Sequence, residues 1–437
     1  REYEEIDIEC DNLISFAKDL LFENKDDSFV LFNPLSYKWS GIIQIPDTYK
    51  NHFIEDIMGN SLVVDFNKRG NFCYVEIEPL SFTTFKKGKK FKPNKNDNRD
   101  QYVLENKLVR YEFNYNGQII SAYDKDVEKD ILIKEGNIFT LYDDNPNNWD
   151  AWDIDFFYRN AKIETAKTME FLGYYGGEML KELTFKLSIG GSIIEQIISL
   201  GPGTKRLDFE TRVDWKETHK MLRVHFPVNV FSERASFDIQ YGYVRRNNHR
   251  NTSWDRAKFE VVGHKYADIS SHDYGVALMN DCKYGYMVHD NILDLNLLRS
   301  PSNPDPDADI RQHEFIYSFY PHENDLIRSN VISESRLLNQ KPILFDGVSS
   351  NIKNEIFLEG DGLELSVIKK AEKKDCWILR IVETHGRTSV GRLYLKGNLI
   401  ESDLMEWNES SEKIKVSEFY PLSLNSFEIK TYMFFDE

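Results

Sequence analysis

Hydrophobic positions near the start of the chain follow a helical period. Between residues 5 and 24 the apolar side chains recur so that they fall on one face of a helix. The positions on this face are Leu13, Ile14, Ala17, Leu20 and Leu21. The pattern predicts one short amphipathic helix, and Asp11 is a candidate for its N-cap. A helix with so apolar a face needs a partner, so we expect it to be the end of a preceding helical region.

From about residue 28 the hydrophobic period changes to two, which is typical of strands. In the segment 208–215, Phe209, Val213 and Trp215 share one face and charged residues occupy the other. Val109, Tyr111 and Phe113 alternate with polar neighbours in the same way. Turn signals recur between such runs, at Asn116-Gly117, Gly190-Gly191, Gly201-Pro202-Gly203 and Asp361-Gly362. The pattern predicts an all-β fold class of several β-sandwiches behind the short N-terminal helix.

Domain boundaries are suggested by local composition. Residues 86–100, KKGKKFKPNKNDNRD, hold six lysines and one arginine with almost nothing apolar. A solvated linker explains this run better than a nucleic-acid patch, because no aromatic residues are interleaved on a regular element. The predicted division is a helical remnant at 1–25, a small β-sandwich at 26–85, a basic linker at 86–100, a large β domain at 101–322 and a C-terminal β-sandwich at 323–437.

Composition and charge exclude several classes of protein. The chain has 437 residues, and 41% of them are hydrophobic, enough for more than one core. No apolar run reaches the roughly 18 residues of a membrane span, which excludes an integral membrane protein. A formal net charge of −17 argues against nucleic acid or an anionic membrane as the main partner.

Cysteine usage and the first residues bear on the compartment. The cysteines lie far apart with no CxxC pair, at Cys10, Cys73, Cys282 and Cys376. This spacing fits neither a disulfide framework nor a zinc ribbon, so we expect a cytoplasmic protein. The sequence begins with Arg1 and shows no signal-peptide pattern, from which we expect a piece of a longer protein.

The segment 145–155, NPNNWDAWDID, is the clearest chemical feature. Strand alternation would place Trp149 and Asp153 on one side and Asp150 and Trp152 on the other. Indole faces pack on the apolar side of a sugar ring while carboxylates accept hydrogen bonds from its hydroxyls. The segment is therefore a candidate sugar site. The plainer alternative is a turn followed by an edge strand, with tryptophan in the core.

Two further segments carry candidate chemistry. The run 245–255, RRNNHRNTSWD, contains His249, which has no second histidine at metal-ligand spacing. The run 297–309, LLRSPSNPDPDAD, precedes His313 and is rich in proline and aspartate. Calcium would suit such carboxylates, but the EF-hand spacing is absent, and a structural or substrate-facing loop is the better interpretation. The whole sequence contains no HxD, HExxH, GxSxG, Walker or Rossmann motif.

Several of these motifs, in this order, resemble glycoside hydrolase family 38 α-mannosidases of the bacterial and cytosolic type. Phe32-Asn33-Pro34-Leu35-Ser36 is similar to the opening of that family's β region. The resemblance continues through the NWDAWDID stretch, HRNTSWD at 249–255, LLRSPSNPDPDAD at 297–309 and His313-Glu314-Phe315, and it covers the chain from about residue 11.

The resemblance implies a fold and a division of labour. The complete enzymes are zinc-dependent retaining exo-glycosidases that remove terminal α-linked mannose from oligosaccharides. Their catalytic residues and zinc ligands lie in N-terminal and bundle regions, which this chain lacks. The large domain is then expected to be a galactose-mutarotase-like supersandwich, and the N-terminal helix the remnant of the bundle. No catalytic residue and no metal ligand is carried onto this chain, which alone is expected to be inactive, with zinc bound in the missing catalytic domain.

The resemblance also implies which residues face the substrate. We expect loops of the large domain to reach the rim of the mannose pocket, to hold sugar hydroxyls or to brace the pocket. The residues placed there are Trp149, Asp150, Trp152, Asp153, His249, Asn251, Arg299 and His313. The same motifs could instead form the interface with the catalytic domain. Expected partners are a mannose-containing oligosaccharide, the chain's own N-terminal catalytic domain and a possible second copy of the protein.

Two other functions remain open from sequence. A free-standing carbohydrate-binding module could use the same aromatic segments, although such a module would not begin with an unpartnered amphipathic helix. A mutarotase-like epimerase would need a histidine and a carboxylate facing each other in the cleft of the sandwich, which sequence cannot locate. The α-mannosidase portion is the preferred hypothesis.

Overall fold

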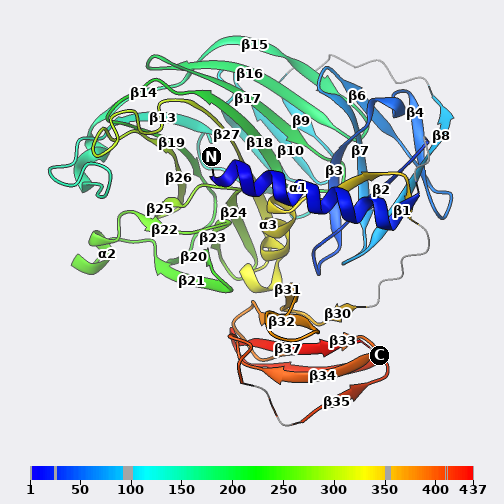
Figure 1. The fold of residues 1–437 in the computed structure, drawn as a ribbon. Helices are drawn as coiled ribbons and strands as arrows, with labels where there is room; N and C mark the ends of the chain where they lie inside the picture. The colour runs from blue at the N-terminus through cyan, green and yellow to red at the C-terminus, as the bar shows by residue number, and fades with distance from the viewer. Residues whose placement is uncertain are drawn as a thin grey trace. The chain divides into compact units, whose positions relative to one another are not determined.

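The computed structural model confirms the all-β fold class (Figure 1). It describes residues 2–23, 27–91, 102–349, 356–408, 410 and 412–436. The chain divides into two compact units. The first combines residues 1–93 with 340–437, and the second comprises residues 94–339. The five predicted domain ranges stay a prediction, but the observed units group the chain differently in the places described below.

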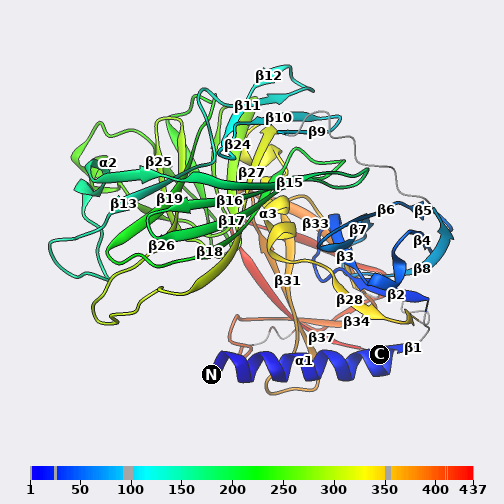
Figure 2. The ribbon, with the colours of Figure 1, turned by 90° about the horizontal axis from the view of Figure 1, so that it is seen from above.

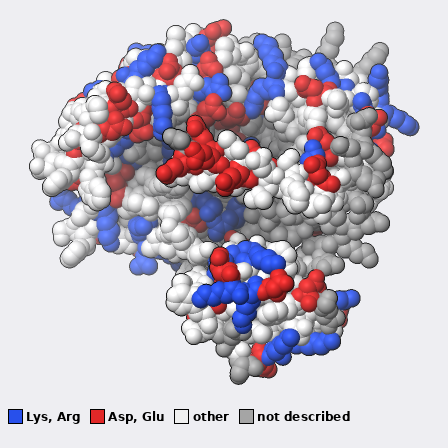
Figure 3. Space-filling view, in the orientation of Figure 1, with Lys and Arg blue, Asp and Glu red and all other residues white. Residues whose placement is uncertain are grey.

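Helix α1 (Glu2–Leu21) is the predicted N-terminal helix. It begins well before Asp11, which lies in its interior, so the prediction of Asp11 as N-cap is wrong. Acidic residues fill its first turn, where negative charge is favoured by the helix dipole, and Figure 3 shows acidic side chains gathered over this part of the helix. None of its residues is buried, and Leu20 is 70% exposed. The predicted apolar face is therefore open to solvent among the described residues.

The first part of unit 1 is built on the sheet order β28-β2-β8-β4-β5, faced by β3-β7-β6, with a small pair β1-β29. Its elements are β1 (Phe22–Glu23), β2 (Ser28–Phe32), β3 (Trp39–Ile45), η1 (Asp47–Tyr49), β4 (His52–Asp56), β5 (Ser61–Leu62), β6 (Val64–Asn67), β7 (Gly70–Ile77), β8 (Phe82–Lys90), β28 (Ile343–Asp346) and β29 (Val348–Ser349). Strand β8 extends into the segment 86–100 that was predicted to be a linker. The rest of that segment lies mostly outside the described residues.

The second part of unit 1 has the sheet orders β30-β33-β36 and β31-β32-β37-β34-β35. Its strands are β30 (Phe357–Glu359), β31 (Leu363–Lys370), β32 (Trp377–Glu383), β33 (Ser389–Tyr394), β34 (Gly397–Ser402), β35 (Ile414–Val416), β36 (Phe419–Leu424) and β37 (Ile429–Phe435). Buried side chains from both sheets form one apolar cluster, including Leu393 and Leu424 from the first sheet and Ile381 and Leu399 from the second. This cluster gives the C-terminal strands a core of their own.

Unit 2 contains a large sheet in the order β15-β16-β17-β18-β27-β24-β23-β20-β21. A second sheet runs β14-β13-β19-β26-β25-β22, and a short one runs β12-β11-β10-β9. The strands are β9 (Val103–Glu105), β10 (Val109–Phe113), β11 (Ile119–Asp124), β12 (Lys129–Asp130), β13 (Ile138–Asp143), β14 (Lys162–Thr165), β15 (Lys167–Gly176), β16 (Lys181–Ile189), β17 (Ser192–Leu200), β18 (Leu207–Asp214), β19 (Lys220–Pro227), β20 (Arg234–Ile239), β21 (Gly242–Asn247), β22 (Val261–Val262), β23 (Tyr266–Ser270), β24 (Tyr274–Asn280), β25 (Gly285–His289), β26 (Ile292–Arg299) and β27 (Gln312–Glu323).

The strands of unit 2 can be followed in Figure 2, and buried aromatic side chains join its sheets. Phe226 of β19 in the second sheet contacts Phe209 and Phe319 of the large sheet, with ring centroids 5.8 and 5.0 Å apart. Tyr111 of the short sheet packs edge-on against Phe319. The alternation in 208–215 thus has the predicted cause, because its apolar face lies in this core.

Short helices complete unit 2. They are α2 (Ser253–Ala257), α3 (Val331–Asn339), η2 (Phe156–Asn160) and η3 (Leu326–Arg328). Val331 and Leu338 of α3 are buried against Tyr266 and Met279 of the large sheet. The segment that follows residue 323 therefore packs within unit 2, although sequence placed it in the C-terminal domain. No helix in the described part of the chain is long and apolar enough to cross a membrane.

Candidate functional site

The predicted site residues lie at strand ends of unit 2 and on the loops that leave them. Arg299 is the last residue of β26, where it pairs with Met221 of β19. Its guanidinium donates from Nε to the carboxylate of Asp144, which follows β13. The same group donates from Nη2 to the carbonyl oxygens of Asp150, at 2.9 Å, and of Asp153. The planar fork of arginine can reach several acceptors at once, so Arg299 fixes the loop between β13 and η2.

Asp150 ties this loop to the segment that follows β26. Its Oδ2 accepts hydrogen bonds from the backbone N–H groups of Ser302, at 2.8 Å, and Asn303, at 3.0 Å. Its Oδ1 lies 3.4 Å from Nδ1 of His219, whose Nε2 is 2.7 Å from the hydroxyl of Ser302. We call the set of Asp144, Asp150, His219, Arg299 and Ser302 the Arg299 cluster.

Charge in the Arg299 cluster is largely shielded from water. The side chain of Asp144 is only 2% exposed and that of Arg299 is 14% exposed. Burial raises the pKa of the Asp144 carboxyl above its ordinary value, while the Arg299 guanidinium acts in the opposite direction. With its donors directed at Asp144 and at loop carbonyls, Arg299 has the role of a brace within this chain.

The tryptophans held by the cluster point into solvent. Trp149 is 74% exposed and Trp152 is 91% exposed, so neither belongs to the core. The expected strand alternation is wrong here, because the segment forms a turn in which the N–H groups of Trp152 and Asp153 both donate to the carbonyl of Trp149. Trp149 adopts the left-handed conformation, with φ of 62°. The arrangement presents two large ring faces of the kind that stack on sugars.

The second predicted segment lies between β21 and α2. A capping box starts α2, since the Thr252 hydroxyl accepts from the Asp255 N–H and the Asp255 carboxylate accepts from the Thr252 N–H. The hydrogen bonds from Thr252 and Asn247 hold the pKa of Asp255 below its ordinary value. His249 Nδ1 lies 3.6 Å from the Asp255 carboxylate. The capping box thus fixes the approach of the chain to α2 and leaves Asn251 on the exposed side of the loop.

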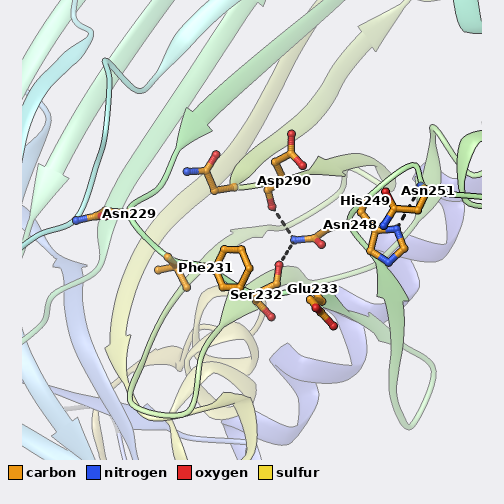
Figure 4. Close-up of a pocket in the computed structure, with 10 residues that line it drawn as sticks. Asn229, Phe231, Ser232, Glu233, Asn248, His249, Asn251 and Asp290 are labelled. Atoms are coloured by element: carbon orange, nitrogen blue, oxygen red, sulfur yellow. Dashed lines mark hydrogen bonds between the residues drawn. The ribbon is translucent and has the colours of Figure 1, made fainter.

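His249 and Asn251 line a cavity of about 520 Å³ in unit 2 (Figure 4). Its walls come from the β19–β20 loop, the β21–α2 loop and the β25–β26 turn. The lining residues are Asn229, Val230, Phe231, Ser232, Glu233, Asn248, His249, Asn251, Asp290 and Asn291. Four of these ten residues are asparagines, and Glu233 and Asp290 add two carboxylates beside the apolar Val230 and Phe231.

The eight predicted residues do not form one site within this chain. Asp150, Asp153 and Arg299 meet directly through the Arg299 cluster. Phe156, which follows the loop held by Arg299, contacts the second predicted segment at Arg250, whose guanidinium carbon lies 5.9 Å from the centroid of the Phe156 ring. His313 on β27 has its Nε2 2.7 Å from the carbonyl of Asp309, and no described hydrogen bond links it to the other predicted residues.

Sequence reasoning missed residues that complete these arrangements. Asp144 and His219 belong to the Arg299 cluster, and Asn229, Phe231 and Asn248 belong to the cavity. Asp144 directly precedes the NPNNWD segment and the asparagines stand at strand ends. Aspartate and asparagine are common at such positions because they form turns. Their presence in the sequence therefore did not identify them as binding residues.

Comparison with known families decides the identity of the fold. The family model "Glycosyl hydrolases family 38 C-terminal domain" matches residues 104–307. The model "Glycosyl hydrolases family 38 C-terminal beta sandwich domain" matches residues 362–432. The chain belongs to glycosyl hydrolase family 38. Both matches are to C-terminal domains of family 38, so the resemblance drawn from the motifs is confirmed.

Relatives place this family 38 chain in the C-terminal portion of longer proteins. It is 31% identical to Alpha-mannosidase G of Dictyostelium discoideum, over 94% of this chain and 40% of that protein. It is 35% identical to human Alpha-mannosidase 2C1, over 65% of this chain and 28% of that protein. The chain thus spans less than half the length of these relatives. An alpha-mannosidase from Enterococcus faecalis V583 has the same fold, with a TM-score of 0.70 at 15% identity, over 93% of this chain and 56% of that one.

Two chemical possibilities can be examined in the family 38 chain. Among the described residues, no group of three or more His, Cys, Asp or Glu side chains is placed to hold a metal ion, so they offer no site for the zinc that the family resemblance implies. A histidine and a carboxylate do face each other, with Nε2 of His322 2.8 Å from Oδ1 of Asp268. Their side chains are 2% and 0% exposed, so this pair is closed to a sugar, whereas His219 and Asp150 of the Arg299 cluster are partly exposed.

Proposed function

We propose that this chain is the C-terminal portion of a retaining α-mannosidase that hydrolyses terminal α-linked mannose from oligosaccharides. Membership of family 38 and 31% identity to Alpha-mannosidase G over almost the whole chain support the proposal. The chemistry of bond cleavage then belongs to an N-terminal catalytic domain, together with the zinc ion. The described residues offer no set of ligands for that ion.

The role of this portion is to support the catalytic domain and to line the rim of the sugar pocket. The single observation that carries this role is the loop held by Arg299, which exposes Trp149 and Trp152. Two exposed indoles on a braced loop would gain free energy by covering an apolar surface, either the face of a sugar ring or the catalytic domain. His249, Asn251 and His313 are further proposed contacts.

The setting of the protein is part of the proposal. The described cysteines are free thiols, which supports a reducing cytoplasm. A mannose-containing oligosaccharide is the proposed substrate, and assembly into a homo-oligomer is the proposed organisation of the whole protein.

A carbohydrate-binding module is the second candidate. The exposed tryptophans and the cavity lined by asparagine favour it, because both features suit sugar binding without hydrolysis. The two candidates differ in whether this chain completes an enzyme.

Hydrolysis of an aryl α-mannoside tests the proposal. The chain alone, with and without added zinc, is expected to give no turnover while its circular dichroism shows folded β structure. A chimaera would join the N-terminal part of Alpha-mannosidase G, which this chain does not cover, to this chain. It is expected to turn over in a zinc-dependent way, and Arg299→Ala in the chimaera is expected to lower kcat/KM at least tenfold.

Two results would contradict the proposal. Zinc-dependent turnover by the chain alone would mean that it holds a catalytic centre. A folded chimaera with no turnover, beside an active Alpha-mannosidase G control, would favour the binding module.

A further inference from the structure

The cavity beside Asn248 is built where three connections of unit 2 meet. Asn248 is 3% exposed, and its side-chain nitrogen donates to the carbonyl oxygens of Ser232, at 2.7 Å, and Asp290, at 2.6 Å (Figure 4). Its backbone N–H donates to the carbonyl of Glu233, and the N–H of Asp290 donates back to the carbonyl of Asn248. These bonds fix both the position and the orientation of the Asn248 amide.

The orientation of the Asn248 amide decides which of its atoms can bind a ligand. Both donor hydrogens of Asn248 are used, so its Oδ1 is left as an acceptor, and no described residue donates to it. Two neighbouring asparagines in the lining each use one amide hydrogen in a bond within the chain. Asn229 donates from Nδ2 to the carbonyl of Asp130, and Asn291 donates to the carbonyl of Val228, each at 2.9 Å. The Asn248 amide is thus fixed by two bonds and those of Asn229 and Asn291 by one each, and all three amide oxygens can accept a hydrogen bond from a ligand.

The charge around the cavity favours a neutral ligand over a cation. The carboxylate of Asp290 lies 2.9 Å from Nδ1 of His289 and is already engaged. Glu233 is then the one lining carboxylate for which the described residues supply no ion-pair partner. Hard cations such as calcium are held by six to eight oxygens that include several carboxylates. A single free carboxylate among amides suits hydroxyl groups better, because a hydroxyl can donate to either kind of oxygen.

An aromatic ring stands beside these acceptors. Phe231 lines the cavity and is 85% exposed. Exposing so large an apolar surface is unfavourable in water, and an aromatic face offers a platform for the C–H side of a sugar ring. The volume of about 520 Å³ is within the range of small-ligand sites and admits one or two pyranose rings.

From this geometry we propose that the cavity is a saccharide-binding site. Asn229, Asn248 and Asn291 accept hydrogen bonds from sugar hydroxyls, Glu233 accepts a further one, and Phe231 stacks on the ring. All of the groups belong to unit 2, so binding requires no second domain. The inference does not depend on the proposed role in hydrolysis, and it holds whether or not the chain completes an enzyme.

Titration of the chain with methyl α-D-mannopyranoside by calorimetry tests the proposal. We expect saturable binding with a dissociation constant on the order of 1 mM, without added metal. Phe231→Ala and Glu233→Ala change exposed side chains and are each expected to weaken binding about tenfold. Tyr115→Ala is the matched control, because Tyr115 is an exposed aromatic residue of unit 2 outside the cavity, and it is expected to bind like the unchanged chain.

Several outcomes would overturn the proposal. Absence of saturable binding by the folded chain would do so, and so would binding that survives both cavity variants. Loss of binding in Trp149→Ala or Trp152→Ala instead would move the sugar to the loop held by Arg299. Binding that appears only with added calcium chloride would make the cavity a cation site. None of these results depends on turnover, so the proposed function is judged separately by the chimaera.

Discussion

Trp149 combines two properties that are each costly for a residue of its kind. It adopts a φ of 62° and remains 74% exposed. The left-handed conformation costs an L-residue roughly 1–2 kcal/mol, and nothing in unit 2 compensates by burying the ring. Strained, exposed residues of this kind cluster at functional sites. The observation supports a role for the indole outside the fold of this chain.

Replacing Trp149 by glycine separates the two properties. Trp149→Gly is expected to stabilise the chain by about 0.5–1 kcal/mol, because glycine adopts a positive φ without strain. Trp152→Gly is the matched control, since Trp152 lacks a positive φ, and it is expected to destabilise by a similar amount. Urea unfolding of unit 2 measures both. Equal effects of the two substitutions would refute the strain at Trp149.

The conformation of the loop between β13 and η2 depends on Arg299. Arg299→Ala is expected to cost about 3 kcal/mol, because it leaves the carboxylate of Asp144 buried without its partner. Arg299→Lys is expected to cost less, since it keeps the charge but loses the fork that reaches the loop carbonyls. Urea unfolding and limited proteolysis within 144–155 provide the measurements.

Removal of the Asp144 charge provides the control for Arg299→Ala. Adding Asp144→Asn to Arg299→Ala is expected to recover part of the loss, because the unpaired charge is then removed. If Arg299→Ala unfolds at the same urea concentration as the unchanged chain, the hydrogen bonds of Arg299 contribute nothing to stability.

Residue identities at the site were partly predictable from sequence. The unusual composition of NWDAWDID and LLRSPSNPDPDAD pointed to loops that do meet, through Arg299. The partners Asp144, His219 and Asn248 were not predictable, because each contact joins strands distant in sequence. A single asparagine or histidine in a turn carries no sign of such pairing.

At the scale of elements, strand β19 carries a histidine that responds to pH. Burial lowers the pKa of His225 below its ordinary value of 6.5, and the Asp294 carboxylate opposes this effect. The unfolded chain therefore binds the proton more tightly. Stability from the neutral His225 is fully present above pH 6.5 and is lost as the pH falls through that value toward the lower pKa of the folded state.

His225→Gln is expected to flatten the acid side of the stability profile. Between pH 8 and pH 5 the unchanged chain should lose more stability than the variant, by about 1.4 kcal/mol for each tenfold difference in proton affinity between folded and unfolded states. Urea midpoints across this range give the comparison. His385→Gln makes the same comparison in unit 1, where burial also lowers the pKa of His385, and it is expected to flatten the acid side of the profile in the same direction. Parallel profiles for the chain and His225→Gln would contradict the prediction.

The elements themselves were more predictable than their partners. Period-two alternation located β10 and β18 almost to the residue, because each has one face in the core. The alternation expected around Trp149 failed, since a turn held by Arg299 overrides the local pattern. The pairing of β28 with β2 left no local signal, because strand pairing is set by distant parts of the chain.

At the scale of the whole molecule, unit 2 has what an independent domain requires. Its core cluster draws only on residues between Leu104 and Phe319, which are contiguous in sequence. Residues 102–339 alone are therefore expected to unfold cooperatively in urea with a β-type circular dichroism spectrum. Residues 1–93 alone lack β28, which covers one edge of β2, and are expected to be markedly less stable. A disordered 102–339 fragment would contradict this division.

Strand β28 also imposes an order on synthesis. Ile343–Asp346 pairs with Ser28–Phe32, and the whole of unit 2 is encoded between them. As the chain leaves the ribosome, one edge of β2 stays unpaired while every strand of unit 2 is synthesised. Unit 2 can fold during that interval, whereas unit 1 closes only when Ile343–Asp346 emerges. An unpaired strand edge is a site of aggregation. The time the ribosome takes to cross unit 2 is therefore the period in which the nascent protein most needs a chaperone.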